Sequence, residues 1–158
     1  MNRGEYRIWD MYDRLESSSI RAFAEDDGGN IYVATTSGVA RIDADMNMTM
    51  LADSQLENAY IRDLRLGCDG LIYGLTWPGD LFTLRDGKLE TWLSRDDCRV
   101  QGVLGMLPDP ERPGDLYLGT SGSVVYHGGF QDNFENAETT DVAPLSYVEG
   151  LEYIDGQI

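Results

Sequence analysis

Residues 29–32 read Gly-Asn-Ile-Tyr, and related tetrapeptides stand at residues 70–73 (Gly-Leu-Ile-Tyr) and 114–117 (Gly-Asp-Leu-Tyr). Their first glycines are 41 and 44 residues apart, and Gly156 stands 42 residues after the third copy. A similarity that returns at a nearly fixed spacing is the mark of a repeat protein, in which each unit folds as one small structural element. The chain is therefore predicted to hold three copies of one unit, with a fourth beginning at its end.

Each unit is predicted to form four short strands. In the first unit, β-rich runs separated by turns occupy residues 20–24, 31–34, 39–42 and 48–51. The second unit has them at 61–66, 71–75, 81–84 and 89–93, and the third at 100–107, 116–118, 124–126 and within 134–140. Glycine and aspartate between such runs are typical of hairpin turns. The tyrosines at 32, 73 and 117 recur at one position of the unit and are expected to pack in the core.

Four strands in about 40–45 residues, with no sustained helical period, are typical of one blade of a β-propeller. We therefore expect an all-β fold, a partial β-propeller of four-stranded antiparallel blades. The phase of the repeat predicts blades at 17–53, 54–94 and 95–143, an outer strand of a preceding blade within 1–16, and the start of a further blade at 144–158.

A closed propeller needs at least four blades. We therefore expect this chain to be part of a longer protein, and expect the segment to self-associate because both of its ends expose unpaired strand edges. Completion of the ring by association of several chains is the alternative.

One segment of the first unit resembles a known family. Residues 17–20 (Ser-Ser-Ser-Ile) and 25–42 (Glu-Asp-Asp-Gly-Gly-Asn-Ile-Tyr-Val-Ala-Thr-Thr-Ser-Gly-Val-Ala-Arg-Ile) are similar to the two-component regulator propeller repeat. Residues 114–122 (Gly-Asp-Leu-Tyr-Leu-Gly-Thr-Ser-Gly) resemble it too. The second unit departs at 74–80 (Gly-Leu-Thr-Trp-Pro-Gly-Asp), where the family has Gly-Thr-x-x-Gly.

The resemblance implies a sensor. Propellers of this family lie outside the cytoplasmic membrane, on the periplasmic side or at the cell surface. A transmembrane helix joins them to a histidine kinase or a diguanylate cyclase, and some respond to carbohydrate breakdown products. It therefore implies an extracytoplasmic segment of a membrane-anchored signalling protein with a small-molecule or oligosaccharide ligand. The first residues have no signal-peptide pattern, so a leader is expected outside this chain.

The charge of the chain excludes one class of partner. Twenty-eight acidic residues against twelve lysines and arginines give a formal charge of −16 in 158 residues. A nucleic-acid-binding domain needs a basic stripe that displaces counterions, and none is available. No apolar run approaches the roughly 18 residues of a membrane span. We therefore expect a soluble segment that does not bind nucleic acid.

A ligand is expected at one face of the propeller, where the loops leading into the first strands meet the loops between second and third strands. The candidates there combine aromatic rings, charges and hydroxyl groups, which suits stacking on a sugar and hydrogen bonding to it. They are Trp77, Asp80, Tyr60, Arg99, Thr76 and Ser121. The alternative is that Trp77 and Pro78 fill the gap between two blades.

Catalytic and metal sites are not expected. The single histidine, His127, is placed in an outer hairpin, and residues 119–123 (Gly-Thr-Ser-Gly-Ser) miss the nucleophile-elbow pattern. Residues 43–47 begin like a calcium loop, but the later glycine and glutamate are missing. The sequence therefore predicts no enzyme, no cofactor and no metal. A scaffold for protein interaction or dimerisation is the alternative to a sensor, and a propeller enzyme whose catalytic groups lie in other blades is the third hypothesis.

Overall fold

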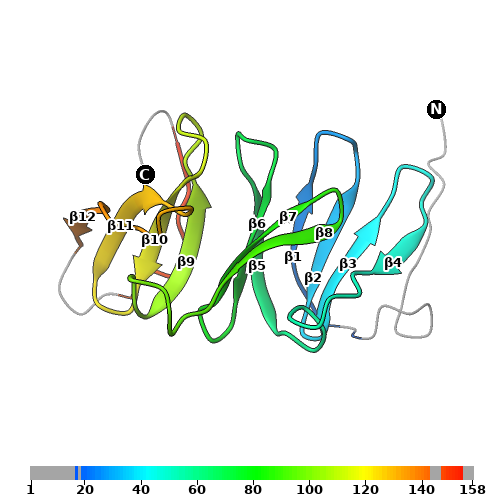
Figure 1. Cartoon of the computed structure of the whole chain (residues 1–158), viewed down its shortest axis with the longest axis horizontal. Helices are drawn as coiled ribbons and strands as arrows, with labels where there is room; N and C mark the ends of the chain where they lie inside the picture. Colours follow the sequence, from blue (N-terminus) through cyan, green and yellow to red (C-terminus); the bar gives the residue numbers. More distant parts are fainter. Residues whose placement is uncertain (1–16, 18, 143–146, 155–158) are drawn as a thin grey trace.

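The computed structural model describes residues 17, 19–142 and 147–154 of the chain. They form three four-stranded antiparallel sheets that follow one another in chain order, and Figure 1 shows the sheets side by side. Within each sheet the strands keep their sequence order, so that every connection is a turn between neighbouring strands. This confirms the predicted all-β partial propeller. The described residues include no helix that could cross a membrane.

The strand limits agree closely with the predicted runs. The first sheet contains β1 (Ile20–Glu25), β2 (Ile31–Thr35), β3 (Gly38–Ile42) and β4 (Met48–Met50). The second contains β5 (Ile61–Leu66), β6 (Ile72–Thr76), β7 (Leu81–Arg85) and β8 (Lys88–Leu93). The third contains β9 (Val103–Pro108), β10 (Asp115–Thr120), β11 (Val124–Gly129) and β12 (Glu138–Asp141). The outer strand expected within residues 1–16 lies outside the described residues, as do 143–146 and 155–158.

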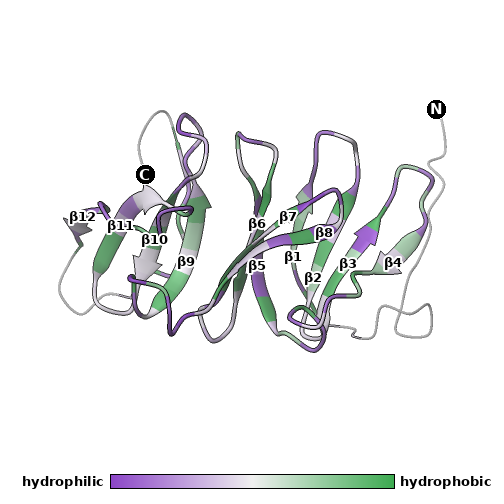
Figure 2. Ribbon diagram, in the orientation of Figure 1, coloured by the Kyte–Doolittle hydropathy of each residue, from purple (hydrophilic) through white to green (hydrophobic). Residues whose placement is uncertain are grey.

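The sheets are arranged as blades around an axis. The first strands of neighbouring sheets lie against each other, β1 against β5 and β5 against β9, and so line the inner side. The fourth strands, β4, β8 and β12, lie outermost in their sheets. In Figure 2 the hydrophobic residues gather on the strands and the hydrophilic ones in the turns.

The core lies between the blades. Between the first and second sheets it contains Tyr32, Ala34, Val39, Leu56, Ile61, Leu64, Ile72, Phe82 and Leu84. Between the second and third it contains Leu71, Tyr73, Leu75, Leu81, Cys98, Val100, Val103, Met106, Leu116, Leu118, Phe130 and Phe134. Tyr32 and Tyr73 are each 1% exposed, which confirms their predicted core position, whereas Tyr117 is only half-buried. These contacts supply most of the favourable free energy of folding.

Two close approaches explain why glycine stands inside strands. The ring of Phe82 lies over Gly74, where any Cβ would overlap it. In the third sheet, a Cβ on Gly105 would lie 2.7 Å from the carbonyl oxygen of Glu149, because the backbone of the described end of the chain passes directly over β9.

Candidate ligand-binding rim

We call the end of the blades formed by the β2–β3, β6–β7 and β10–β11 turns the aromatic rim, and the opposite end the aspartate rim. At the aromatic rim each first strand contains one extra residue. The pairing of β1 with β2 passes from Ile20 directly to Ala22, so that Arg21 forms a β-bulge. Arg62 occupies the equivalent place in β5 and Leu104 in β9. A bulge of this kind re-aims a side chain away from the regular alternation of the strand.

An aromatic pair stands beside these bulges in the second blade. Tyr60 immediately precedes β5, Trp77 immediately follows β6, and the Trp77 N–H donates a hydrogen bond to the Tyr60 carbonyl oxygen at 2.8 Å. The two ring centroids are 5.9 Å apart with the planes inclined at 48°. Trp77 is 60% exposed, so it does not fill the gap between blades. The ring is available to a ligand.

Each of the two bulge arginines lies over one of these rings. The Arg21 guanidinium carbon is 5.3 Å from the centroid of Tyr60, and the Arg62 guanidinium carbon is 5.3 Å from that of Trp77. Contacts of this length are cation–π interactions. The guanidinium of Arg62 also faces the Glu149 carboxylate at 3.6 Å. Arg21, Tyr60, Trp77 and Arg62 thus form one continuous surface, which we call the platform.

The third blade shows that the fold does not require these aromatic side chains. There the same backbone hydrogen bond runs from the N–H of Ser121 to the carbonyl oxygen of Gly102, at 2.9 Å. Serine and glycine therefore support the same turn in which the second blade has tryptophan and tyrosine. The aromatic rings are an addition to the repeat.

Thr76 and Asp80, two of the predicted ligand residues, fasten the β6–β7 turn. The buried Thr76 hydroxyl donates to Asp80 Oδ2 at 3.1 Å and accepts from the Asp80 N–H at 2.9 Å. Asp80 Oδ1 accepts from the N–H of Arg95 at 2.9 Å. Thr35 and Thr120 stand at the same position in the other blades and donate across their own turns. Both side chains are therefore already engaged within the protein.

Arg99 and Ser121, also predicted, make their described contacts with other residues than the aromatic pair. The Arg99 guanidinium pairs with Glu135 at 3.3 Å, and the backbone N–H of Arg99 donates to Asn133 Oδ1 at 3.0 Å; both partners lie in the β11–β12 connection. Ser121 lies in the third-blade turn against Gly102. Of the six predicted residues, the structure joins Tyr60 with Trp77 and Thr76 with Asp80. Arg99 lies in a connection between blades, and a local sequence pattern does not show the path of such a connection or its contacts, here with Glu135.

The sequence prediction missed the two arginines of the platform. Their signal is the dipeptide Ile-Arg, which occurs at residues 20–21 and again at 61–62, immediately inside the first strand of each unit. Only the register of the strands reveals that the arginine is the bulged residue.

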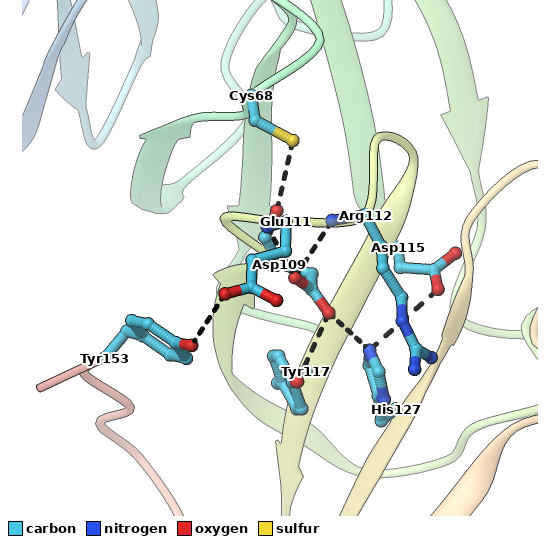
Figure 3. Close-up of polar contacts among 8 residues, drawn as sticks. All are labelled: Cys68, Asp109, Glu111, Arg112, Asp115, Tyr117, His127 and Tyr153. Carbon is cyan, nitrogen blue, oxygen red and sulfur yellow. Dashed lines mark hydrogen bonds and ion pairs between the residues drawn. The ribbon is translucent and has the colours of Figure 1, made fainter. Parts of the chain in front are cut away.

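The aspartate rim carries a second polar cluster, in the third blade (Figure 3). Asp109 is only 5% exposed. Its Oδ1 accepts hydrogen bonds from the N–H groups of Glu111 at 2.8 Å and Arg112 at 3.0 Å. Its Oδ2 accepts from the Tyr117 hydroxyl at 3.2 Å and lies 2.8 Å from Nε2 of His127. The imidazole of His127 stacks on the Tyr117 ring with centroids 4.0 Å apart.

These contacts keep Asp109 ionised. Burial by itself would raise the pKa of Asp109, but the hydrogen bonds from Glu111, Arg112, His127 and Tyr117 together outweigh it, so that the pKa of this carboxyl lies below its ordinary value. A carboxylate only accepts hydrogen bonds, so Nε2 of His127 carries the proton in this contact. An imidazole oriented by a carboxylate is the arrangement that general bases use. A cavity of about 400 Å³ lies next to it, lined by Tyr117, Val125, His127 and Glu138 among others.

The aspartate itself belongs to the repeat. In the first blade the Tyr32 hydroxyl donates to Asp26 at 3.1 Å, and in the second the Tyr73 hydroxyl donates to Asp69 at 2.6 Å. The aspartate–tyrosine contact therefore closes the turn between the first two strands of every blade. His127 is an extra partner that the third blade adds.

No family model and no curated protein matches this chain. Among solved structures it is similar to a streptogramin B lyase (15% identity, 78% of this chain and 40% of that one, TM-score 0.56). It is also similar to virginiamycin B lyase from Staphylococcus aureus (14% identity, 82% of this chain and 44% of that one, TM-score 0.56). A third similar structure is AztD from Citrobacter koseri (11% identity, 82% of this chain and 36% of that one, TM-score 0.58). These proteins are β-propellers, and at such identities the likeness shows the fold. The chain spans about two fifths of their length.

These neighbours correct one expectation from the sequence, that the chain is not an enzyme. The two lyases are enzymes and share its fold, so a blade architecture of this kind gives no ground for excluding catalysis. The shortage of histidine is no better ground, since the single histidine is oriented by a buried carboxylate. The exclusion was wrong because it treated the outer hairpin as remote from any polar cluster.

Proposed function

We propose that this chain is the ligand-binding part of a sensory β-propeller whose platform at the aromatic rim takes an oligosaccharide. The observation that carries the proposal is the exposure of Trp77 beside Tyr60, at positions where another blade has serine and glycine. A sugar presents an apolar ring face that packs on an aromatic face, while its hydroxyl groups bind nearby polar groups. Binding sites combine such apolar surface with a few oriented polar groups.

The cellular role is part of the same proposal. Residues 17–42 resemble two-component regulator propeller repeats, which supports an extracytoplasmic location and a membrane-anchored parent with a kinase or cyclase output. The charge of −16 supports a soluble segment and argues against nucleic acid as its partner. Occupation of the platform would then be the input that such a parent transmits.

The proposal is tested by ligand-dependent stabilisation. A panel of neutral and acidic oligosaccharides is added to the whole chain and the melting temperature is measured. A true ligand stabilises by mass action, so the melting temperature rises with its concentration. Trp77→Ala should abolish the rise while leaving the melting temperature without ligand nearly unchanged, because the side chain is exposed.

The matched control is Tyr153→Ala, which removes an aromatic side chain, 37% exposed, that contacts Glu111 at the aspartate rim. This variant should bind as the wild type does. If no sugar shifts the melting temperature, the ligand proposal is dropped. Self-association that ligands and Trp77→Ala leave unchanged would then favour the interaction scaffold.

A further inference from the structure

We infer that the platform selects a sugar that carries a carboxylate over the same sugar without the charge, an inference that rests on the proposed function. The reason is the placement of two arginines on the aromatic pair in a protein with a formal charge of −16. Acidic side chains outnumber basic ones more than two to one, so two arginines against the exposed Trp77 and the half-buried Tyr60 call for a local explanation.

The two arginines reach the platform by the same structural device. Arg21 and Arg62 are the bulged residues of equivalent strands in neighbouring blades. The third blade has Leu104 at this position and no aromatic pair beside it, since Gly102 and Ser121 stand there. The first blade has Ser19 and Thr36 in place of the aromatic pair, so the arginines of two blades meet the pair that the second blade supplies.

These charges are only weakly compensated within the protein. Arg21 is exposed and forms no ion pair with any other described residue. Arg62 meets Glu149 at 3.6 Å, through a glutamate side chain that is 65% exposed and therefore easily displaced. The nearby Asp63 is engaged by Arg65 at 3.1 Å and by the N–H of Leu64 at 2.9 Å. The Arg62 side chain itself is only 17% exposed, so Arg21 is the guanidinium open to a ligand carboxylate, and displacement of Glu149 would open Arg62 to it as well.

The chemistry of guanidinium suits a carboxylate. Its planar fork donates two parallel hydrogen bonds to the two oxygens, and charge-assisted bonds of this kind are roughly twice as strong as neutral ones. Each arginine is packed on a ring, which restricts its orientation before a ligand arrives and lowers the entropic cost of binding. A sugar stacked on Trp77 thus places a ring carboxylate within the surface that the two guanidiniums border.

The net negative charge of the chain opposes this preference only weakly in physiological salt. The Debye length at 0.15 M ionic strength is about 8 Å, so acidic side chains far from the platform are largely screened. A carboxylate in direct contact with Arg21 or Arg62 is screened much less. Direct contacts of the ligand carboxylate with Arg21 and Arg62 therefore decide the preference for the acid over the ester.

The experiment compares one oligosaccharide in two charge states. Oligogalacturonate and its methyl ester have the same rings, and only the first is charged. We expect the wild-type chain to bind the acid at least about tenfold more tightly in 0.15 M salt, which corresponds to one charge-assisted contact of about 1.4 kcal/mol. The affinity for the acid should fall as salt is raised, and that for the ester should not.

Three variants separate the contributions of the platform. Arg21→Gln and Arg62→Gln should each lower the affinity for the acid by a larger factor than the affinity for the ester, whereas Trp77→Ala should weaken both ligands by similar factors. Arg21 is exposed, so its replacement tests the charge without disturbing the fold. Arg85→Gln is the control, because Arg85 is half exposed and paired with Glu90 at 3.1 Å, away from the platform. It should change neither affinity.

The outcomes distinguish the two proposals. Equal binding of acid and ester, or a preference that survives both arginine replacements, overturns the charge selection while the platform remains a sugar site. Absence of binding by both forms overturns the assignment of the platform as well as its selectivity.

Discussion

Replacing Asp109 by alanine should destabilise the protein by about 3–5 kcal/mol. The carboxylate, 5% exposed, accepts two backbone and two side-chain hydrogen bonds. A hydrogen bond to a charged group contributes about 1.5–3 kcal/mol, and a buried donor left without a partner costs about 1–3 kcal/mol. The backbone donors lie in a turn that water can reach, so we count mainly the losses at Tyr117 and His127.

The magnitude translates into a measurable shift. For a domain of about 150 residues, 1 kcal/mol changes the melting temperature by roughly 2–4 °C, so the alanine variant should melt about 6–20 °C below the wild type. Calorimetry or circular dichroism measures this. Asp109→Asn should lose less stability than the alanine variant, because the amide oxygen still accepts from the two backbone N–H groups. The stability that it does lose comes from the NH₂ group, which faces two side-chain donors. The control Asp96→Asn alters a carboxylate that is 84% exposed and should stay within about 0.5 kcal/mol. An alanine variant as stable as this control would refute a structural role for the cluster.

Three further predictions follow from the packing and the buried charges. Gly74→Ala should destabilise by several kcal/mol in urea unfolding, because its Cβ would overlap the Phe82 ring and force the core to shift. Thr83→Val should stabilise by about 1 kcal/mol in the same assay, since the Thr83 hydroxyl is buried and no described residue bonds to it; an unchanged or lower stability would mean that it has a partner. Stability should decline as the pH falls below about 4. Asp26 and Asp109 have pKa values below the ordinary 3.8, so the folded chain binds fewer protons than the unfolded chain there; acid titration followed by circular dichroism should show the decline, and a midpoint unaffected by Asp109→Asn would contradict this cause.

The repeat could be predicted from the sequence because its pattern is local. Glycine-aspartate turns and alternating runs are read within five or six residues, and the strands predicted in the second unit nearly coincide with β5 to β8. The position of Trp77 at an exposed turn follows from the same pattern. Two of the recurring tyrosines, Tyr32 and Tyr73, were correctly predicted to pack inside, whereas Tyr117 is half-buried, and the aspartates that bind their hydroxyl groups were not identified.

What the sequence did not reveal depends on register and on contacts between distant segments. Arg21 and Arg62 reach the rings only because one residue is inserted into a strand, and a pattern of alternation does not show an inserted residue. Asp109 and His127 are 18 residues apart and meet through the pairing of β10 with β11. The contact of Arg99 with Glu135, 36 residues away, is hidden from a local pattern for a related reason.

The aspartate–tyrosine contact has a consequence for how such a chain can evolve. In each unit the aspartate and the tyrosine that bind each other lie within a stretch of no more than nine residues. A duplicated unit therefore contains both residues of the contact. Insertion or loss of a whole unit then leaves the turns of all other units intact. The opposite end of every unit is free to diverge meanwhile, as the exchange of glycine and serine for tyrosine and tryptophan illustrates. The contact that fastens each unit and the position at which the units differ in aromatic side chains thus lie at opposite ends of one small module.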